Sequence, residues 1–256
     1  MNSGGSFFCS SIGRKILMAV SGLMLIGFVV GHLVGNLQVF QGPEHLNGYA
    51  EFLHTMGPML WVARIGVVAA VLVHVWAATV LTLENRAARG PEVYGFKHTI
   101  QATLASRSMR ITGYIVGAFL LYHLAHFTWG LAQVDTFKDS LKEYPLATDY
   151  RVAGFVAVKA GTITKDVYNM VVLGFQNVFV SGFYIVAVGL LSFHLVHGFD
   201  SMFQTFGLRS GRWARGLRLV SILFCTVYFL GNLAMPAAVL LGKLQPHTPA
   251  VAAAHK

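Results

Sequence analysis

Five long apolar stretches limit what this chain can fold into more than any other feature of its sequence. Crossing the hydrocarbon core of a bilayer as a helix takes about 20 mostly apolar residues, and each stretch reaches that length. Only a helix satisfies its own backbone hydrogen bonds in lipid, so the sequence predicts an all-α integral membrane bundle of five transmembrane helices. The expected helices cover roughly residues 16–40, 59–83, 111–133, 179–204 and 217–241.

Composition agrees with a membrane location and excludes several kinds of site. Charged residues make up 11% of the chain, whereas soluble domains carry about 25%. The two cysteines, Cys9 and Cys225, lie far apart, which excludes an iron–sulfur cluster held by this chain alone and a CxxCH haem attachment site. The sequence contains neither GxGxxG nor GxxxxGK[ST], so no flavin or nucleotide site of those types is expected.

Basic residues are distributed unevenly among the connections, and this predicts the orientation. The third connection balances its basic residues with acidic ones, and the first has Glu44 and Glu51 but no basic residue before Arg64. Cytoplasmic loops carry the excess of Lys and Arg, so we expect the N-terminus in the cytoplasm and the C-terminus outside. The net charge of +9 therefore follows from membrane topology, and no nucleic-acid partner is expected. The residues predicted to lie on the cytoplasmic side are Arg14, Lys15, Arg86, Arg89, Lys97, Arg107, Arg110, Arg209, Arg212, Arg215 and Arg218.

Residues 1–244 are expected to form a single transmembrane domain, followed by a disordered tail at 245–256 that is rich in Ala and Pro. The third connection, about 45 residues long, exceeds what mere linkage needs. Its stretch Tyr168–Gln176 is predicted to form a short amphipathic helix on the outer surface.

Six of the 11 histidines fall inside the apolar stretches. An ionisable group at membrane depth is costly, so it usually faces the bundle interior and has a function. A single such histidine is as well explained by a hydrogen bond to a neighbouring helix, but four helices that each present a deep histidine point to a shared role. The six are His32, His74, His123, His126, His194 and His197.

Depth along the helices sorts the histidines into two pairs. At about 1.5 Å per residue, His32 lies about 24 Å along the first span from its inner end, and His123 about 18 Å along the third. By the same rise His74 and His194 lie about 14–15 Å from the inner ends of the second and fourth spans. We call His32 and His123 the outer pair, and His74 and His194 the inner pair. Each pair places two imidazoles at matched depth on different helices. The two pairs therefore predict two haems within the bundle, each bound by two histidines.

The neighbouring histidines leave an alternative. His126 and His197 each follow a proposed ligand by three residues and share roughly its helix face. On the residues alone, either can be the ligand instead, or contact a haem propionate or a partner helix.

At this point the sequence resembles a known family, the membrane-anchor cytochrome b subunits of succinate:quinone oxidoreductases, in their single-chain, five-helix, di-haem form shared with certain fumarate reductases. The resemblance covers nearly the whole chain. In that family a TG pair precedes the third-helix ligand by about eleven residues, and the fourth ligand stands four residues before a glycine. Thr112-Gly113 and Gly198 fit His123 and His194, and so favour these two over His126 and His197. The landmark segments are SGLMLIGFVVGHL, AAVLVHVWA, RITGYIVGAFLLYH and FYIVAVGLLSFHLVHG.

The resemblance implies two haems b and an enzyme complex in the bacterial cytoplasmic (inner) membrane. A flavoprotein subunit would oxidise succinate or reduce fumarate, and an iron–sulfur subunit would connect it to the cytoplasmic face of this chain. The inner and outer haems would then relay electrons to or from a membrane quinone, with menaquinone favoured. The membrane lipid is a further expected partner, and a higher oligomer of the complex stays open.

Quinone chemistry moves protons and needs a carboxylate or an imidazole near the reacting oxygens. The first outer connection offers Glu44, His45, Glu51 and His54. Glu51 and His54 are the candidate quinone-site residues, although solvated loop side chains explain them equally well. Some fumarate-reducing relatives carry a proton-conducting glutamate two residues before the fourth ligand. In this sequence the fourth ligand is His194, and Ser192 occupies the position of that glutamate.

Two other interpretations stay open. A cytochrome b of a hydrogenase or formate dehydrogenase commonly places two ligands on one helix, unlike the one principal histidine per helix here. A haem-free transporter usually shows buried carboxylates or broken helices at the midplane, and the predicted spans contain no acid besides Asp200 before Glu84 at the edge of the second span.

Overall fold

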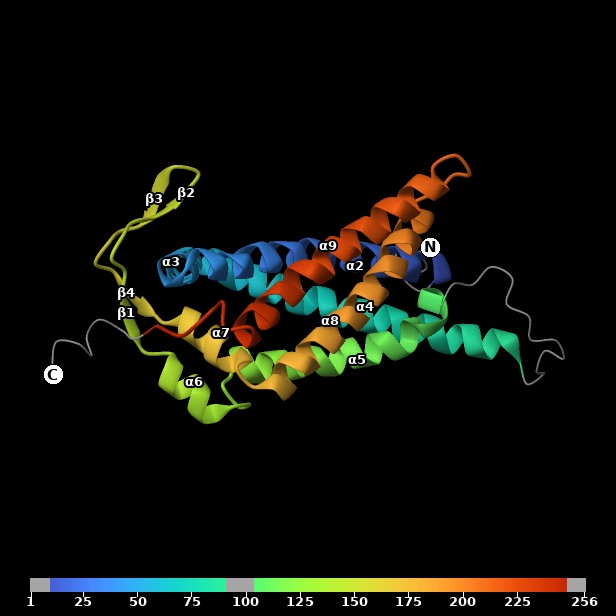
Figure 1. Cartoon of the computed structure of the whole chain (residues 1–256). Coiled ribbons are helices and arrows are strands. Elements are labelled where there is room, and N and C mark those ends of the chain that lie inside the picture. Colours follow the sequence, from blue (N-terminus) through green and yellow to red (C-terminus); the bar gives the residue numbers. More distant parts are fainter. Residues whose placement is uncertain (1–9, 91–103, 248–256) are drawn as a thin grey trace.

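Five long helices form a bundle, and shorter elements cover one end of it (Figure 1). The computed structural model describes residues 10–90 and 104–247; residues 1–9, 91–103 and 248–256, which include Cys9, Lys97 and most of the expected tail, lie outside the described residues. The bundle helices are α2 (Ser11–Asn36), α4 (Pro58–Arg89), α5 (Leu104–Phe127), α8 (Val178–Thr205) and α9 (Ala214–Leu240).

Four of the five helices are long and apolar enough to cross a membrane, which confirms the expected transmembrane character of the chain. They are α2 with its 3₁₀ extension η1 (Leu37–Gln41), α4, α8 and α9. The expected third span, α5, is not among these four. It is 24 residues long, but Arg107, Arg110 and its tyrosines and histidines dilute the apolar run. Helix α5 nevertheless packs along α8, and it reaches the end of the bundle that the shorter elements cover (Figure 1).

Helix ends follow local chemistry and differ from the expected boundaries. The Ser10 side chain accepts a hydrogen bond from the Gly13 amide at 3.0 Å, so α2 begins earlier than expected. The third helix was expected to reach residue 133, which is wrong, because α5 ends at Phe127. There the amides of Leu131 and Ala132 turn back to the Ala125 carbonyl, and Gly130 adopts a φ of +63° that favours glycine.

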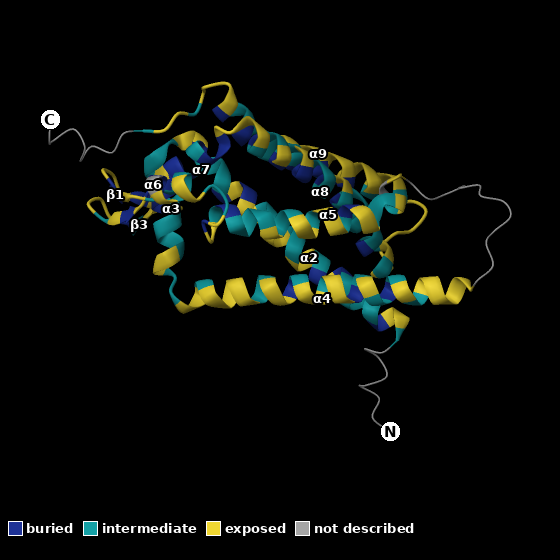
Figure 2. Cartoon of the chain, turned by 90° about the horizontal axis from the view of Figure 1, so that it is seen from below, coloured by how far each residue is buried: buried dark blue, intermediate teal, exposed yellow. Residues whose placement is uncertain are grey.

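The bundle helices pack in a definite order. Helix α2 packs against α4 and α8, and α8 packs in turn against α5 and α9, whereas the main helix contacts of α4 are with α2. Much of the outward surface of α4 is exposed (Figure 2). It includes Val62, which is 70% exposed, and Leu72, which is 65% exposed. In a membrane protein such exposed apolar side chains face lipid.

We call the elements at the covered end of the bundle the cap. It consists of α3 (Pro43–Thr55), α6 (Val134–Ser140), β1 (Glu143–Pro145), β2 (Tyr150–Val152), β3 (Phe155–Val158), β4 (Ile163–Lys165) and α7 (Val167–Phe175). Strand β1 pairs antiparallel with β4, and β2 with β3. The expectation of an all-α fold is therefore wrong in the third connection. Burial alternates along β1 and β4, so that Tyr144 and Thr164 face inward, which is the pattern of a strand.

The short helix expected at Tyr168–Gln176 is present as α7, but it does not lie on the surface as predicted. Six of its residues are buried, because it packs against α3, α6 and α9 and touches α5 and α8. The cap has a small core of its own, formed by Tyr144, Leu146, Tyr150 and Val158. Gly48 of α3 allows the Tyr150 ring to approach closely, since a Cβ there would lie 2.7 Å from that side chain.

Candidate functional site

The two histidine pairs expected from depth are neighbours in space. The ring centroids of His32 on α2 and His123 on α5 lie 5.7 Å apart, with the ring planes at 90°. Those of His74 on α4 and His194 on α8 lie 6.4 Å apart, at 65°. The bundle thus joins four helices through two imidazole pairs, one toward the cap and one toward the opposite end.

The helices that carry each pair do not pack closely on each other. Within the described chain, backbone contact between α2 and α5, and between α4 and α8, is marginal at most. Open space lies beside the outer pair, since a Cβ added at Gly27, Gly31 or Gly117 would meet nothing within 4 Å. Among the described residues, no side chain or neighbouring helix occupies the space beside these glycines.

The inner pair is anchored by two hydroxyl groups. Ser21 Oγ lies 3.3 Å from Nδ1 of His74, and Thr112 Oγ1 lies 3.3 Å from Nδ1 of His194. Each hydroxyl also donates its hydrogen to the backbone carbonyl four residues earlier, at 2.7 and 3.1 Å respectively. A hydroxyl has one hydrogen, so it must accept the hydrogen bond from the ring. Nδ1 is then protonated, and the lone pair of each ring is on Nε2.

The outer pair has a different environment, in which a buried tyrosine is central. The Tyr184 hydroxyl lies 3.4 Å from Nδ1 of His123 and 3.0 Å from Nδ1 of His126. Tyr184 is 6% exposed, and Phe119, Tyr122, Phe127 and Phe175 surround it. The sequence analysis did not identify this residue.

The alternative ligands lie apart from the pairs. His126 is only 2% exposed, its ring stacks on Phe127 at 3.9 Å between centroids, and its Nε2 is directed to Gly174 of the cap. His197 is half-buried one turn beyond His194, and among the described residues the ring contact of His74 is with His194. His123 and His194 are therefore the residues that the bundle brings to a partner imidazole.

Glu51 and His54, the candidate quinone residues, lie at the end of α3 in the cap, Glu51 half-buried and His54 exposed. No hydrogen bond or ring contact joins either one to a histidine pair in the described part of the chain. Glu44 has a structural role instead. It accepts hydrogen bonds from the Tyr144 hydroxyl at 2.5 Å and the Ala147 amide at 2.9 Å, so that it ties α3 to the strands.

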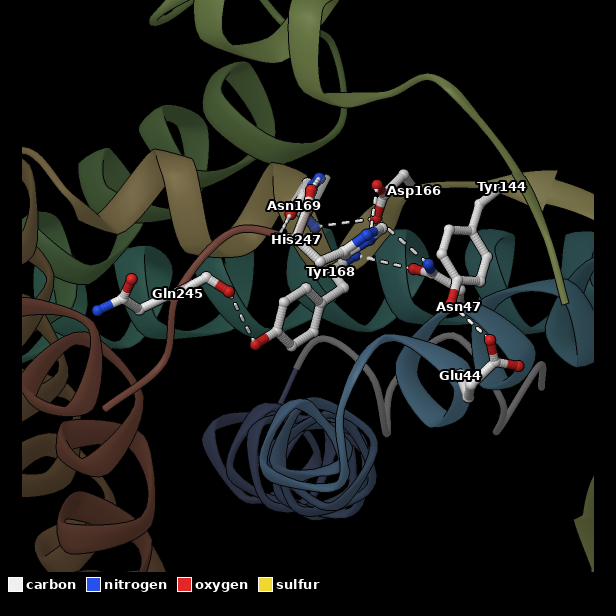
Figure 3. A network of polar contacts seen from close by, with 8 residues as sticks. All are labelled: Glu44, Asn47, Tyr144, Asp166, Tyr168, Asn169, Gln245 and His247. Carbon is white, nitrogen blue, oxygen red and sulfur yellow. Dashed lines mark hydrogen bonds and ion pairs between the residues drawn. The ribbon is translucent and has the colours of Figure 1, made fainter. Parts of the chain in front are cut away.

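A second polar cluster lies inside the cap, around the buried carboxylate of Asp166 (Figure 3). One oxygen of Asp166 accepts from the Asn47 amide at 3.2 Å and from the backbone amide of Asn169 at 3.0 Å. The other oxygen lies 3.0 Å from Nε2 of His247. Burial, followed by the charge of Asp166, raises the pKa of Tyr168, which stays a neutral donor to the Gln245 carbonyl at 3.2 Å.

This cluster corrects the expected boundary of the tail. Residues 245–256 were predicted to be disordered, yet His247 exchanges two backbone–side-chain hydrogen bonds with Asn169, at 2.8 and 2.9 Å. The segment Gln245–His247 is thus bound to α7 through its backbone, a contact that its Ala- and Pro-rich surroundings do not indicate. The remaining residues of the tail, 248–256, lie outside the described residues.

The pairs fit a haem better than a bare metal ion. Among the residues that the structure describes, no group of three or more His, Cys, Asp or Glu is arranged to hold a metal ion. A haem brings four nitrogens of its own and takes only axial ligands from the protein. With metal–nitrogen bonds of about 2 Å and ring nitrogens about 1 Å from their centroids, two axial imidazoles have centroids roughly 6 Å apart. Both observed separations are close to that value.

The sequence does contain a signal for the two hydroxyl anchors. Ser21-Gly22 is followed after nine residues by His32-Leu33, and Thr112-Gly113 is followed after nine residues by His123-Leu124. In each copy the hydroxyl residue holds the histidine of the next long helix, His74 or His194. Both copies lie within the landmark segments SGLMLIGFVVGHL and RITGYIVGAFLLYH, but their correspondence was not predicted.

Comparison of the chain with protein-family models, with curated proteins and with solved structures finds no match.

Proposed function

We propose that this chain is the di-haem cytochrome b anchor of a succinate:quinone oxidoreductase. The proposal is carried by one observation. Four helices contribute two pairs of imidazoles, and the ring centroids within the pairs lie 5.7 and 6.4 Å apart. His32 and His123 would hold one haem, and His74 and His194 the other. A haem b, when bound, supplies one-electron redox chemistry, and two of them in one bundle suit electron transfer across the membrane.

We propose five membrane crossings, and the position of the cap supports this number. Helix α3 lies between α2 and α4 in the chain, and the other cap elements lie between α5 and α8, yet α3 contacts α7 and strands β2 to β4. These two connections are therefore on the same side of the bundle. If α4 and α8 cross the membrane, α5 has to cross it as well. Its exposed apolar residues, among them Ile111 and Leu121, suit a lipid-facing surface.

The proposed orientation places the cap outside a bacterial cytoplasmic membrane and the opposite end in the cytoplasm. That opposite end has a surplus of arginine, as in the connection with Arg209, Arg212 and Arg215, which is the usual cytoplasmic pattern. Glu84, the acid at the edge of α4, pairs with Arg14 at the start of α2. An iron–sulfur subunit with its flavoprotein would dock on this face.

The quinone site remains assigned to the cap side, with Glu51 and His54 as the proposed proton-handling residues. The support is their chemistry and their position on α3, which follows the helix that bears His32. Ser192 donates its hydroxyl to the Val188 carbonyl at 2.9 Å inside α8 and offers no carboxylate beside His194. In this proposal, proton exchange with quinone uses residues of the cap.

The decisive measurement is the haem content of the purified chain or complex. We expect a pyridine haemochrome assay to give two haems b per chain, and a reduced-minus-oxidised spectrum to show both. Replacement of His32 or His74 by leucine removes one haem each, and the two single variants lose different haems. An intact, folded wild-type protein without haem would overturn the proposal. Two haems without succinate or fumarate activity in the complex would favour the hydrogenase or formate dehydrogenase type.

A further inference from the structure

The seats of His74 and His194 are built alike, although they come from different halves of the chain. Ser21 and Thr112 supply the hydroxyl groups, each 3.3 Å from the ring Nδ1. The glycine after each hydroxyl residue leaves room for the ring. A Cβ at Gly22 would lie 3.3 Å from Cε1 of His74, and one at Gly113 would lie 3.4 Å from Cε1 of His194. Each imidazole thus rests in a notch formed by a hydroxyl group and a glycine.

The hydrogen bonds in each notch allow one ring tautomer. Each hydroxyl donates its hydrogen to a backbone carbonyl of the preceding turn. Its oxygen therefore accepts a hydrogen bond from Nδ1 of the histidine ring. An accepting oxygen needs a donor, so the ring nitrogen that faces it, Nδ1, carries the proton in both His74 and His194.

We infer that Ser21 and Thr112 are positioning residues, and that both act on the same haem, the inner one. Their hydroxyl groups would hold the two imidazoles that bind this haem, those of His74 and His194, in the tautomer with the proton on Nδ1. The inference rests on the proposed function. A ligating histidine that donates its second ring N–H is oriented by that bond and becomes a more basic ligand. More basic axial ligands favour oxidised iron, so the two hydroxyls keep the inner haem harder to reduce than it would be without them.

The outer pair lacks this arrangement. His123 shares the Tyr184 hydroxyl with His126, at the longer distance of 3.4 Å. His32 has ring contacts with Phe28 and His123, and within the described residues it has no side-chain hydrogen-bond partner. Loss of Ser21 or Thr112 should therefore act on the inner haem alone.

The test is a potentiometric titration of both haems in the purified wild-type complex and in the variants Ser21→Ala and Thr112→Ala. We expect each variant to make the same one of the two haems easier to reduce, with about a tenfold change in its reduced-to-oxidised ratio at fixed potential, the lower end of second-shell effects. Both imidazoles of the inner pair remain in each variant, so the haem should be retained. Ser21→Thr and Thr112→Ser keep the hydroxyl and should restore the wild-type titration.

Ser221→Ala is the matched control. Ser221 is fully buried on α9 and donates to the carbonyl four residues earlier, at 2.9 Å, as Ser21 does, but among the described residues it has no hydrogen bond to an imidazole. The Ser221→Ala variant should leave the titration of both haems unchanged. Shifts of different haems by Ser21→Ala and Thr112→Ala, equal shifts of both haems, or no shift would overturn the inference while the di-haem function stands. A wild-type protein without haem would overturn both.

Discussion

At the scale of single residues, two histidines on one helix face illustrate how packing separates a ligand from a structural side chain. His123 and His126 are three residues apart and have the same chemistry. His123 reaches a second imidazole across the bundle, whereas His126 is enclosed by Phe127, Tyr184 and the cap. A ligand has to present a free ring nitrogen to the cofactor, and only His123 does so.

This difference predicts opposite outcomes for the same substitution. His123→Leu should lose one haem per chain, because the outer pair is left with one imidazole. His126→Leu should keep two haems and lose thermal stability, by about 1 kcal/mol, since the Tyr184 hydroxyl loses its closer partner and keeps only His123, at 3.4 Å. Haem content and the midpoint of thermal unfolding in detergent measure the two effects. Loss of a haem in His126→Leu alone would reverse the assignment.

At the scale of elements, the cap depends on polar contacts between segments that are far apart in the chain. Asp166 caps the N-terminus of α7, receives the Asn47 side chain from α3 and faces His247 from the C-terminal segment. Three segments meet at one buried carboxylate. Its removal would leave several donors without an acceptor in a dry environment, which is costly for each of them.

We therefore expect Asp166→Ala to loosen the cap while the bundle helices stay folded. The loss of the helix cap costs about 1 kcal/mol, and each buried donor left unsatisfied adds about 1–3 kcal/mol. Faster hydrogen exchange in α3 and α7 and earlier proteolysis near residue 247 would report it. Glu143→Ala, at an exposed position in β1, is the control. Equal protection of the cap in both variants would contradict a central role for Asp166.

At the scale of the whole molecule, the arrangement of the cap supports the proposed topology. The contacts of α3 with α7 and the strands place the first and third connections together, although four apolar helices alone would allow them to be on opposite sides. The repeated Ser/Thr-Gly and His positions on α2 and α5 add an internal correspondence between the two halves. In each half, a helix pair carries one histidine of the inner pair and one of the outer pair.

Cysteine labelling of the whole chain tests this topology. In a background with Cys9→Ser and Cys225→Ser, we expect Thr55→Cys and Lys159→Cys to react with a membrane-impermeant thiol reagent in intact spheroplasts. Ser210→Cys should react only after permeabilisation. All three positions are exposed in the structure, so accessibility depends on the side of the membrane. Labelling of positions 55 and 159 from opposite sides would show that α5 does not span.

The sequence by itself determined the transmembrane character of four helices, the approximate limits of the bundle helices and the depth of each histidine along its helix. These properties depend on local quantities, namely the length of an apolar run and the constant rise per residue of a helix. It also indicated α7, since a short apolar helix is a local feature.

Depth along the helices already predicted the two histidine pairs. Only the tertiary structure decided which hydroxyls hold the inner pair, whether His123 or His126 faces His32, and how the cap is built. Those outcomes depend on the rotation of each helix about its axis and on contacts between residues such as Ser21 and His74, or Asn47 and Asp166, that are distant in sequence. A shift of one residue turns a helical side chain by about 100°, so spacing alone did not separate His123 from His126. The strands pack against α3, and the segment Gln245–His247 is bound to α7. These contacts join residues that are distant in sequence, so no local sequence pattern predicts them.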